Sequence, residues 1–340
     1  MTRKYNIAIV GATGLVGETL LSILEERQFP VGQLFPLASA RSAGQTITFK
    51  NKPFYVQDLA DFDFTHVEFA FFSAGAKVSA QFAPIATEAG CIVIDNTSHF
   101  RYEPDVPLIV PEVNPDALID YRERNIIANP NCSTIQMVVA LKPIYDAVGI
   151  DRINVATYQA VSGSGRKGIN ELATQTTDLL NGRETEAKVY SQQIAFNVIP
   201  HCDEFQDNGY TKEEMKMVWE TQKILEDDSI LVNPTTVRVP VFYGHSEAVH
   251  IETRNKLSAA DARELLKNAP GIVVIDEPEN NIYPTPFHQA AGQDAVFVGR
   301  IREDISHPLG LNLWVVADNV RKGAALNAVQ IAELMLKREL

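Results

Sequence analysis

The first thirty residues constrain the fold most strongly. Tyr5–Val10 is a short apolar run without polar alternation, which is typical of a strand covered on both faces. Glycines follow at three-residue spacing (Gly11, Gly14 and Gly17), and a helical pattern of apolar residues begins at Leu20. Strand, glycine-rich turn and helix in this order are the fingerprint of a dinucleotide-binding unit, because the glycines let backbone N–H groups approach a pyrophosphate.

The end of the second predicted strand, residues 33–39, indicates which dinucleotide binds. An NAD site usually has an acidic residue there, which accepts a hydrogen bond from the ribose 2′-hydroxyl. This chain has Ala40, Arg41 and Ser42 instead. A carboxylate would repel a 2′-phosphate, whereas a guanidinium and a hydroxyl can bind it, so we predict NADP. The alternative is that Arg41 is an ordinary solvated loop residue.

Further alternation of strands and helices up to about residue 130 predicts a Rossmann-like, doubly wound parallel sheet. The strand at 67–72 ends in a turn of small residues that can pass beneath the cofactor: Ser73, Ala74 and Gly75. A polar stretch after the strand at 91–94 contains Arg101, a candidate anion ligand at the edge of the sheet where ligands bind. The alternative for Arg101 is a solvated surface arginine.

A single cysteine stands where an extended run gives way to a helical pattern. Ile126–Ala128 is apolar, and Ser133 and Thr134 open the helix directly after Cys132. The unsatisfied N–H groups and the macrodipole at a helix N-terminus favour thiolate over thiol, and the thiolate is the nucleophile. Most lone cysteines are small buried hydrophobic residues, so this stretch alone leaves both interpretations open.

From residue 153 onward, strand-like runs surround three helical segments, which predicts a second, α+β domain with a mixed, largely antiparallel sheet. We expect a first domain at 1–130, a second at 131–318, and a terminal helix at 319–340 that returns to the first. The predicted strands are 153–161, 235–243, 248–253, 272–275, 295–300 and 311–317, and the predicted helices are 168–180, 211–226 and 258–268.

Three polar residues of the second domain are candidates for chemistry. Gln159 ends a strand before a serine- and glycine-rich turn that suits hydrogen bonding to a ligand amide or carbonyl. His245 is a candidate acid/base, and Arg238 is a candidate carboxylate ligand. Their odd separation would place them on opposite faces of one straight strand, so we expect a kink at Gly244. His250 on the next strand is more typical of a structural histidine.

Composition excludes several classes of function. The chain of 340 residues has a net charge of −13, which disfavours nucleic acid and anionic membrane as partners. No apolar run is long enough for a membrane span. Its three cysteines give neither a disulfide framework nor a CxxC metal spacing, which favours a cytoplasmic protein without a bound metal.

These segments, in this order, resemble the aspartate-β-semialdehyde dehydrogenase family along nearly the whole chain. The matching motifs are Gly11–Gly17, Ser98–Arg101, Asn129–Thr134, Tyr158–Gly163, Glu220–Lys223, Arg238–Val241, Gly244–Glu247 and Asp318–Gly323. The resemblance implies NADPH-dependent reduction of β-aspartyl phosphate to aspartate β-semialdehyde and phosphate. That reaction lies on the route to lysine, diaminopimelate, threonine and methionine.

The resemblance also implies roles for individual residues. Cys132 would be the thioester-forming nucleophile, His245 the acid/base, and Gln159 would position the acyl group. The implied substrate ligands are Arg238 and Glu220 for the α-carboxylate and amino groups, Arg101 and Lys223 for the phosphate, and also Asn131. The predicted NADP contacts are Gly11, Thr13, Gly14, Leu15, Val16, Ala40, Arg41, Ser42, Ser73, Ala74, Gly75, Ser162, Gly163 and Asn319. The family is homo-oligomeric, usually dimeric through the second domain, with a tetramer as the alternative.

Two other functions compete with this prediction. N-acetyl-γ-glutamyl-phosphate reductase shares the architecture and the cysteine/histidine chemistry. Glu220 favours a free α-ammonium, because an acetylated nitrogen has no charge to pair. A non-catalytic NADP-binding redox sensor would bind cofactor without turnover, and the complete set of nucleophile, base and anion ligands argues against it.

Overall fold

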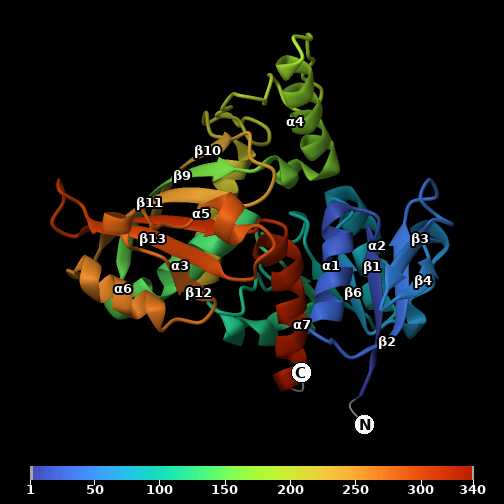
Figure 1. Ribbon diagram of the computed structural model, residues 1–340. Coiled ribbons are helices and arrows are strands. Elements are labelled where there is room, and N and C mark those ends of the chain that lie inside the picture. Colours follow the sequence, from blue (N-terminus) through green and yellow to red (C-terminus); the bar gives the residue numbers. More distant parts are fainter. Residues whose placement is uncertain (1–2, 339–340) are drawn as a thin grey trace. The chain divides into compact units, whose positions relative to one another are not determined.

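The computed structural model describes residues 3–338 and divides them into two compact units (Figure 1). The first unit contains residues up to 131 together with those from 324 onward, and the second contains Cys132–Gly323. Within residues 3–338, no helix is both long and apolar enough to cross a membrane.

The first unit is built on a six-stranded sheet in the order β5-β2-β1-β6-β7-β8, and each neighbouring pair is parallel. This confirms the predicted Rossmann-like, doubly wound sheet. The order reverses at β1, whose neighbours are β2 and β6, and ligands of such sheets bind at a reversal of this kind. The strands are β1 (Tyr5–Val10), β2 (Val31–Ala38), β5 (Gln57–Asp58), β6 (Phe69–Phe72), β7 (Ile92–Asp95) and β8 (Ile126–Ala128).

The helices of this unit are α1 (Leu15–Glu26), α2 (Ala76–Glu88) and the C-terminal α7 (Leu326–Arg338). Helices α1 and α7 pack against each other in one apolar core, and Arg27, directly after α1, pairs with Glu333 on α7 at 2.7 Å. Helix α7 begins seven residues later than predicted. The carboxylate of Asp318 accepts hydrogen bonds from the N–H groups of Val320 and Arg321, so the chain first makes a tight turn before the α-helix starts.

A short hairpin in the first unit escaped the sequence analysis. It pairs β3 (Thr46–Phe49) with β4 (Lys52–Tyr55) through Lys50 and Asn51, which both adopt positive φ. Two such residues between twisted strands form the turn that hairpins prefer.

The remaining short elements of the two units are the 3₁₀ segments Leu59–Asp61, Phe64–His66, Pro115–Glu123, Val161–Ser164 and Pro278–Asn280, and the π-helical turns Pro286–Ala290 and Arg321–Ala325.

The second unit contains a six-stranded mixed sheet in the order β10-β9-β11-β14-β13-β12. The β10–β9 and β12–β13 pairs are parallel and the other three are antiparallel, which confirms the predicted mixed sheet. The strands are β9 (Ile150–Gln159), β10 (Leu231–Arg238), β11 (His245–Thr253), β12 (Ile272–Val274), β13 (Val296–Glu303) and β14 (Gly310–Ala317), and the helices are α3 (Cys132–Val148), α4 (Gly165–Leu180), α5 (Lys212–Leu225) and α6 (Ala259–Lys267).

Two predicted boundaries in this unit were wrong in ways that matter for the site. The strand predicted at 235–243 ends at Arg238, close before Pro240, a residue that cannot donate a ladder hydrogen bond. The next strand begins at His245 rather than at residue 248. Helix α3 contains Pro143 and continues to Val148. Odd-numbered residues of β9 and β11 are the more buried ones, and α3 packs against both strands.

Candidate active site

Cys132 is the first residue of α3, as the change of pattern in the sequence predicted. Its side chain is only partly buried, whereas Cys91 and Cys202 are buried. Burial raises the pKa of the Cys91 thiol far above its usual range and that of Cys202 to about 11. Cys132 therefore combines partial exposure with a helix N-terminus, which is where reactive cysteines occur.

The backbone next to Cys132 depends on a glycine from the end of the chain. A Cβ atom placed on Gly323 would lie 2.8 Å from the Cβ of Cys132, a distance that real side chains do not tolerate. The turn that carries Gly323 is held by Asp318, whose carboxylate accepts hydrogen bonds from the N–H groups of Gly292, Val320 and Arg321 at 2.7, 2.8 and 2.9 Å. The Asp318–Gly323 motif thus shapes the backbone around the nucleophile.

His245, the first residue of β11, is fully enclosed by protein. Its Nδ1 accepts a hydrogen bond from the N–H of Ala160 at 3.0 Å, and its Nε2 has no hydrogen-bond partner among the described residues. Burial, together with the nearby Arg238 guanidinium, lowers the pKa of the imidazole to about 3. The ring is therefore neutral at physiological pH, and because Nδ1 is an acceptor, Nε2 carries the proton.

Arg238 and His245 meet at the end of β9. Arg238 ends β10 on one side of β9, and His245 begins β11 on the other side. The Nη1 of Arg238 donates to the Ala160 carbonyl at 2.6 Å, and the Ala160 N–H donates to His245. A Cβ atom on Gly163 would lie 2.8 Å from Nη1 of Arg238 and 3.5 Å from Nε2 of His245, so both groups line the same turn.

The expected kink at Gly244 is a turn between two strands. Gly244 has a φ of +88°, and the stretch after Arg238 leaves the sheet before β11 begins. Arg238 and His245 lie on different strands with β9 between them, so their odd spacing along the chain does not place them on opposite faces of one strand.

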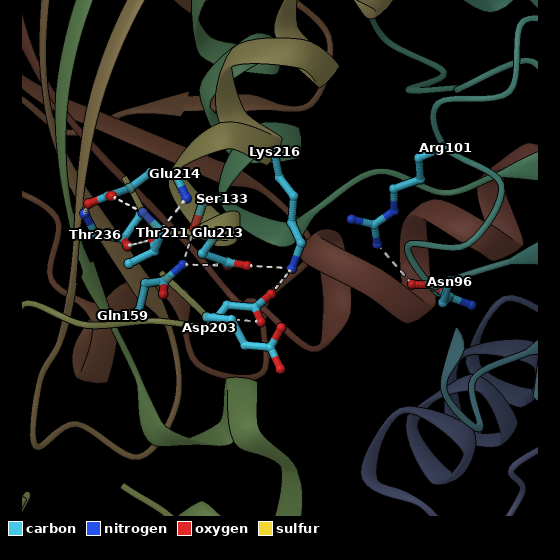
Figure 2. A network of polar contacts seen from close by, with 11 residues as sticks. Asn96, Arg101, Ser133, Gln159, Asp203, Thr211, Glu213, Glu214, Lys216 and Thr236 are labelled. Carbon is cyan, nitrogen blue, oxygen red and sulfur yellow. Dashed lines mark hydrogen bonds and ion pairs between the residues drawn. The ribbon is translucent and has the colours of Figure 1, made fainter. Parts of the chain in front are cut away.

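Gln159, the last residue of β9, is the centre of a buried polar network (Figure 2). Its Nε2 donates to the Ser133 hydroxyl at 2.7 Å and to Glu213 at 3.0 Å, and its Oε1 has no hydrogen-bond partner among the described residues. Lys216 pairs with Glu213 at 2.9 Å and with Asp203 at 2.7 Å. Burial alone would lower the pKa of Lys216, but the two carboxylates outweigh it and raise that pKa.

Glu213 and Lys216 were missed by the sequence analysis, which named Glu220 and Lys223. All four residues lie on α5 with the same Glu-to-Lys spacing, and the second pair follows the first by seven residues, which leaves them on one helix face. Glu220 is fully buried, two turns beyond Glu213. The sequence offers two equivalent pairs. In the structure, Glu213 of the first pair accepts a hydrogen bond from Gln159, and Lys216 also pairs with Asp203.

The turn that carries Arg101 is ordered by a buried carboxylate. Asp95, at the end of β7, accepts hydrogen bonds from the hydroxyls of Ser79 and Thr97 at 2.9 and 2.8 Å. Burial raises the pKa of Asp95, and these hydrogen bonds oppose the shift. Arg101 itself is buried and donates to the Asn96 carbonyl at 2.9 Å (Figure 2). The alternative that Arg101 is a solvated surface residue is therefore wrong.

The glycine-rich turn of the first unit fits a dinucleotide. Gly11 has a φ of +92°, and a Cβ atom there would lie 2.9 Å from Ser73 Oγ. A Cβ atom on Gly17 would lie 2.2 Å from the Gly11 carbonyl. Gly14 caps α1 without a side-chain hydrogen bond, so the first-turn N–H groups are not capped from that residue. Arg41 is exposed in the turn after β2, and the small residues Ser73–Gly75 follow β6.

Asn319 contacts one other predicted cofactor residue, Ser162, and the turn at Gly244. Its Oδ1 accepts hydrogen bonds from the hydroxyl of Ser162 and from the N–H of Gly244, both at 3.0 Å. The second bond holds the turn that leads into His245. Among the described residues, no group of three or more His, Cys, Asp or Glu side chains is arranged to hold a metal ion.

The chain has a parallel dinucleotide-type sheet followed by a mixed-sheet domain that begins with a cysteine, and two family models place it in the semialdehyde dehydrogenase class. The chain matches the family models "Semialdehyde dehydrogenase, NAD binding domain" over residues 6–121 and "Semialdehyde dehydrogenase, dimerisation domain" over residues 141–322. It is 66% identical over 339 residues to the aspartate-semialdehyde dehydrogenase of Legionella pneumophila, covering 100% of this chain and 97% of that protein.

Solved structures agree with these sequence matches. The crystal structure of aspartate semialdehyde dehydrogenase II from Vibrio cholerae, complexed with ASA, is 62% identical, with a TM-score of 0.97 over 99% of each chain. The Candida albicans enzyme solved with NADP is 27% identical, with a TM-score of 0.77 over 98% of each chain. The chain belongs to the aspartate-semialdehyde dehydrogenase family.

Proposed function

We propose that the protein reduces β-aspartyl phosphate to L-aspartate β-semialdehyde and phosphate with NADPH, through a thioester on Cys132. The observation that carries this proposal is the set of groups at the end of β9. A buried donor histidine and a buried arginine meet there at Ala160, and Gln159 contacts Ser133, the residue after the cysteine.

In the proposed reaction, a bond between the Cys132 sulfur and the acyl carbon first forms and later breaks. The Cys132 thiolate attacks the acyl carbon, the C–S bond forms, and the C–O bond to phosphate breaks. NADPH, when bound, would supply the hydride that converts the thioester to the alkoxide of a thiohemiacetal. Collapse of this alkoxide breaks the C–S bond, which releases the aldehyde and restores the thiolate with no net transfer of a proton. Backbone N–H groups in the first turn of α3 can stabilise the oxyanion during the attack.

We propose that His245 acts from its neutral form in the direction of reduction. Nε2 carries the proton and lacks a partner among the described residues, so it can donate to the oxygen that gains negative charge. A neutral imidazole is an effective donor because it costs no buried positive charge. In the oxidative direction Nε2 accepts the hydroxyl proton of the thiohemiacetal, and the ring must then release its contact with Ala160 or start from the other tautomer.

Charges in the second unit support recognition of an amino-acid substrate. Arg238 has donors beyond its bond to Ala160, including a buried Nε without a partner among the described residues, and it suits the α-carboxylate. Lys216 with the carboxylates of Glu213 and Asp203 carries a net charge of −1, which favours an added ammonium group. We therefore propose Glu213, ahead of Glu220, as the partner of the α-ammonium. Arg101 and a lysine of α5, Lys216 or Lys223, are the proposed phosphate ligands, and Asn131 remains a predicted substrate contact.

NADP is the proposed cofactor. The Gly11–Gly17 turn would hold the pyrophosphate, and Arg41 and Ser42 would bind the 2′-phosphate. Two observations support this proposal: no acidic side chain stands at residues 40–42, and the related Candida albicans enzyme was solved with NADP. Ser162, Gly163 and Asn319 are the proposed contacts of the second unit with the cofactor.

A homodimer through the second unit is the proposed assembly. The family model that matches residues 141–322 is described as a dimerisation domain. The sheet face opposite α3 has Tyr158 and Trp314 in ring contact, with centroids 5.5 Å apart. A cavity of about 350 Å³ on this face is lined by Trp314, Tyr283 and Arg302 among other residues. An exposed aromatic face of this kind is typical of an interface. Sedimentation of the purified protein tests it, and a monomer at micromolar concentration would contradict it.

We further propose a cytoplasmic enzyme of lysine, diaminopimelate, threonine and methionine biosynthesis. None of the three cysteines, all of which lie in the described part of the chain, forms a disulfide, which suits a reducing compartment. The decisive assay supplies aspartate semialdehyde, phosphate and NADP and follows reduction of the cofactor, with N-acetylglutamate semialdehyde assayed in parallel. Preference for the acetylated substrate would replace the proposed function with that of the N-acetyl-γ-glutamyl-phosphate reductase family. Cofactor binding without turnover of either substrate would indicate a redox sensor.

A further inference from the structure

One buried carboxyl group in the second unit has no part in the proposed chemistry. Glu247 lies two residues after His245 on β11, so both side chains are on the more buried face of that strand, which α3 packs against. The Glu247 side chain is fully enclosed, and neither of its carboxyl oxygens has a hydrogen-bond partner among the described residues. An ionised carboxylate in these surroundings would be very costly.

The neighbour of this carboxyl group is an amide on the helix that carries the nucleophile. Gln136 follows Cys132 by one turn of α3, so the two residues share a helix face. Its Nε2 donates to the backbone carbonyl of His245 at 3.4 Å, whereas its buried Oε1 has no donor among the described residues. Burial raises the pKa of Glu247, and the neighbouring Gln136 amide opposes that shift in part, so the amide lies beside the carboxyl group.

Protonation of Glu247 would satisfy both groups at once. An ionised Glu247 could only accept hydrogen bonds, and the Gln136 Oε1 would stay without a donor. A neutral Glu247 has an O–H group that can donate to that oxygen. An unsatisfied buried polar atom is costly, so a bond from the Glu247 O–H group to the Gln136 Oε1 adds to burial, the main factor that favours the neutral form.

We propose that Glu247 is a neutral carboxylic acid that donates a hydrogen bond to Gln136 and thereby holds α3 in register with β11. Because Gln136 also bonds the His245 carbonyl, this pair fixes the spacing between Cys132 and His245. Glu247 is a positioning residue, since it acts through Gln136. The inference rests on the proposed roles of Cys132 and His245. Burial raises the pKa of Glu247 well above its usual range, which agrees with a protonated group.

Infrared spectroscopy tests the protonation state without any assay of activity. The wild-type protein at pH 7.5 should show the carbonyl stretch of a buried protonated carboxylic acid, and that band should be lost from the Glu247→Gln variant. Glu171→Gln is the matched control, because the Glu171 carboxylate is buried but accepts hydrogen bonds from the N–H groups of Lys188 and Val189. A difference spectrum between wild type and Glu247→Gln without the band would overturn the proposal.

Unfolding in urea gives a second, independent readout. The folded chain keeps the Glu247 proton at pH values where the unfolded chain loses it, so this group destabilises the folded state increasingly as pH rises above the ordinary glutamate pKa. The free energy of unfolding of Glu247→Gln minus that of wild type should therefore be larger at pH 8 than at pH 5. A difference between the two proteins that does not depend on pH would contradict a neutral Glu247.

Kinetics test the positioning role. Glu247→Gln keeps a donor for Gln136 and should retain kcat within about twofold. Glu247→Met removes that donor and should lower kcat roughly tenfold or more, because a small displacement of reacting groups is costly. KM for both substrates should stay within about twofold in Glu247→Met. Wild-type kcat in Glu247→Met would overturn the role. If Glu247→Met does not fold, Gln136→Met removes the same bond from the helix side and should show the same split between kcat and KM.

The two levels of inference fail separately. If the wild-type protein lacks phosphate-dependent oxidation of aspartate semialdehyde, the proposed function is wrong, and the infrared and urea results still decide whether Glu247 is neutral. If the wild type is active and both apolar variants keep its kcat, only the positioning role is wrong.

Discussion

The two units provide their functional groups in different ways. In the first unit the proposed cofactor site consists largely of backbone and small residues in one short stretch, Gly11–Gly17, where Cβ atoms would collide. In the second unit the proposed chemistry depends on buried side chains from β9, β10, β11, α3 and α5, which are far apart in the sequence. The first kind of site is defined by local geometry. The second depends on strand order and on the electrostatics of burial.

The strongest test of this difference is the Cys132→Ala variant. Turnover should fall by about 10⁴-fold or more, because loss of a nucleophile removes the covalent route. Calorimetric titration with NADPH should show affinity close to wild type, because the predicted pyrophosphate site belongs to the first unit. Persistent turnover would refute the nucleophile, and a large loss of NADPH affinity would show that the two kinds of site are not separable.

The two Glu/Lys pairs of α5 sharpen the comparison within the second unit. Glu213→Gln should lower kcat/KM for aspartate semialdehyde roughly 100-fold, because it removes a buried carboxylate that contacts both Gln159 and Lys216. Glu220→Gln on the same helix face is the matched variant. Steady-state kinetics with both proteins decide between the pairs, and a larger loss in Glu220→Gln would favour the pair named from the sequence.

Burial of His245 predicts a pH dependence of stability. Its pKa in the folded chain is lowered to about 3. Below about pH 6.5 the unfolded chain therefore binds a proton at this imidazole, and the folded chain does not. Between pH 7 and pH 5 this group should reduce the free energy of unfolding by about 2 kcal/mol. Urea titrations of wild type and His245→Asn measure the difference. An equal loss of stability in both proteins would show that the imidazole protonates within the folded state.

The smallest expected effect concerns Arg41 in the first unit. Arg41→Ala should weaken NADPH binding by about tenfold, because an exposed guanidinium contributes modestly to phosphate binding in water. NADH binding should stay nearly unchanged, because that cofactor has no 2′-phosphate. Fluorescence titration with both cofactors measures the ratio, and equal losses would refute the 2′-phosphate contact.

Local signals were sufficient for much of the fold. The strand Tyr5–Val10 has the bounds that its apolar run predicts, and the helix at Cys132 starts where the pattern changes. Boundaries failed where one residue changes the hydrogen bonding, as at Arg238 before Pro240. The hairpin at 46–55 was missed because its turn lacks glycine and proline, although Lys50 and Asn51 adopt the positive φ that it needs.

The sequence by itself determined the class of fold, the glycine turn, the cysteine at a helix start and the family, because each of these depends on residues close together in the chain. The tertiary structure alone decided which Glu/Lys pair of α5 contacts Gln159, and that Arg238 and His245 share Ala160. These contacts depend on β9 lying between β10 and β11, with one parallel and one antiparallel neighbour. Such pairing joins residues that no spacing along the chain connects, and the burial that follows keeps His245 neutral.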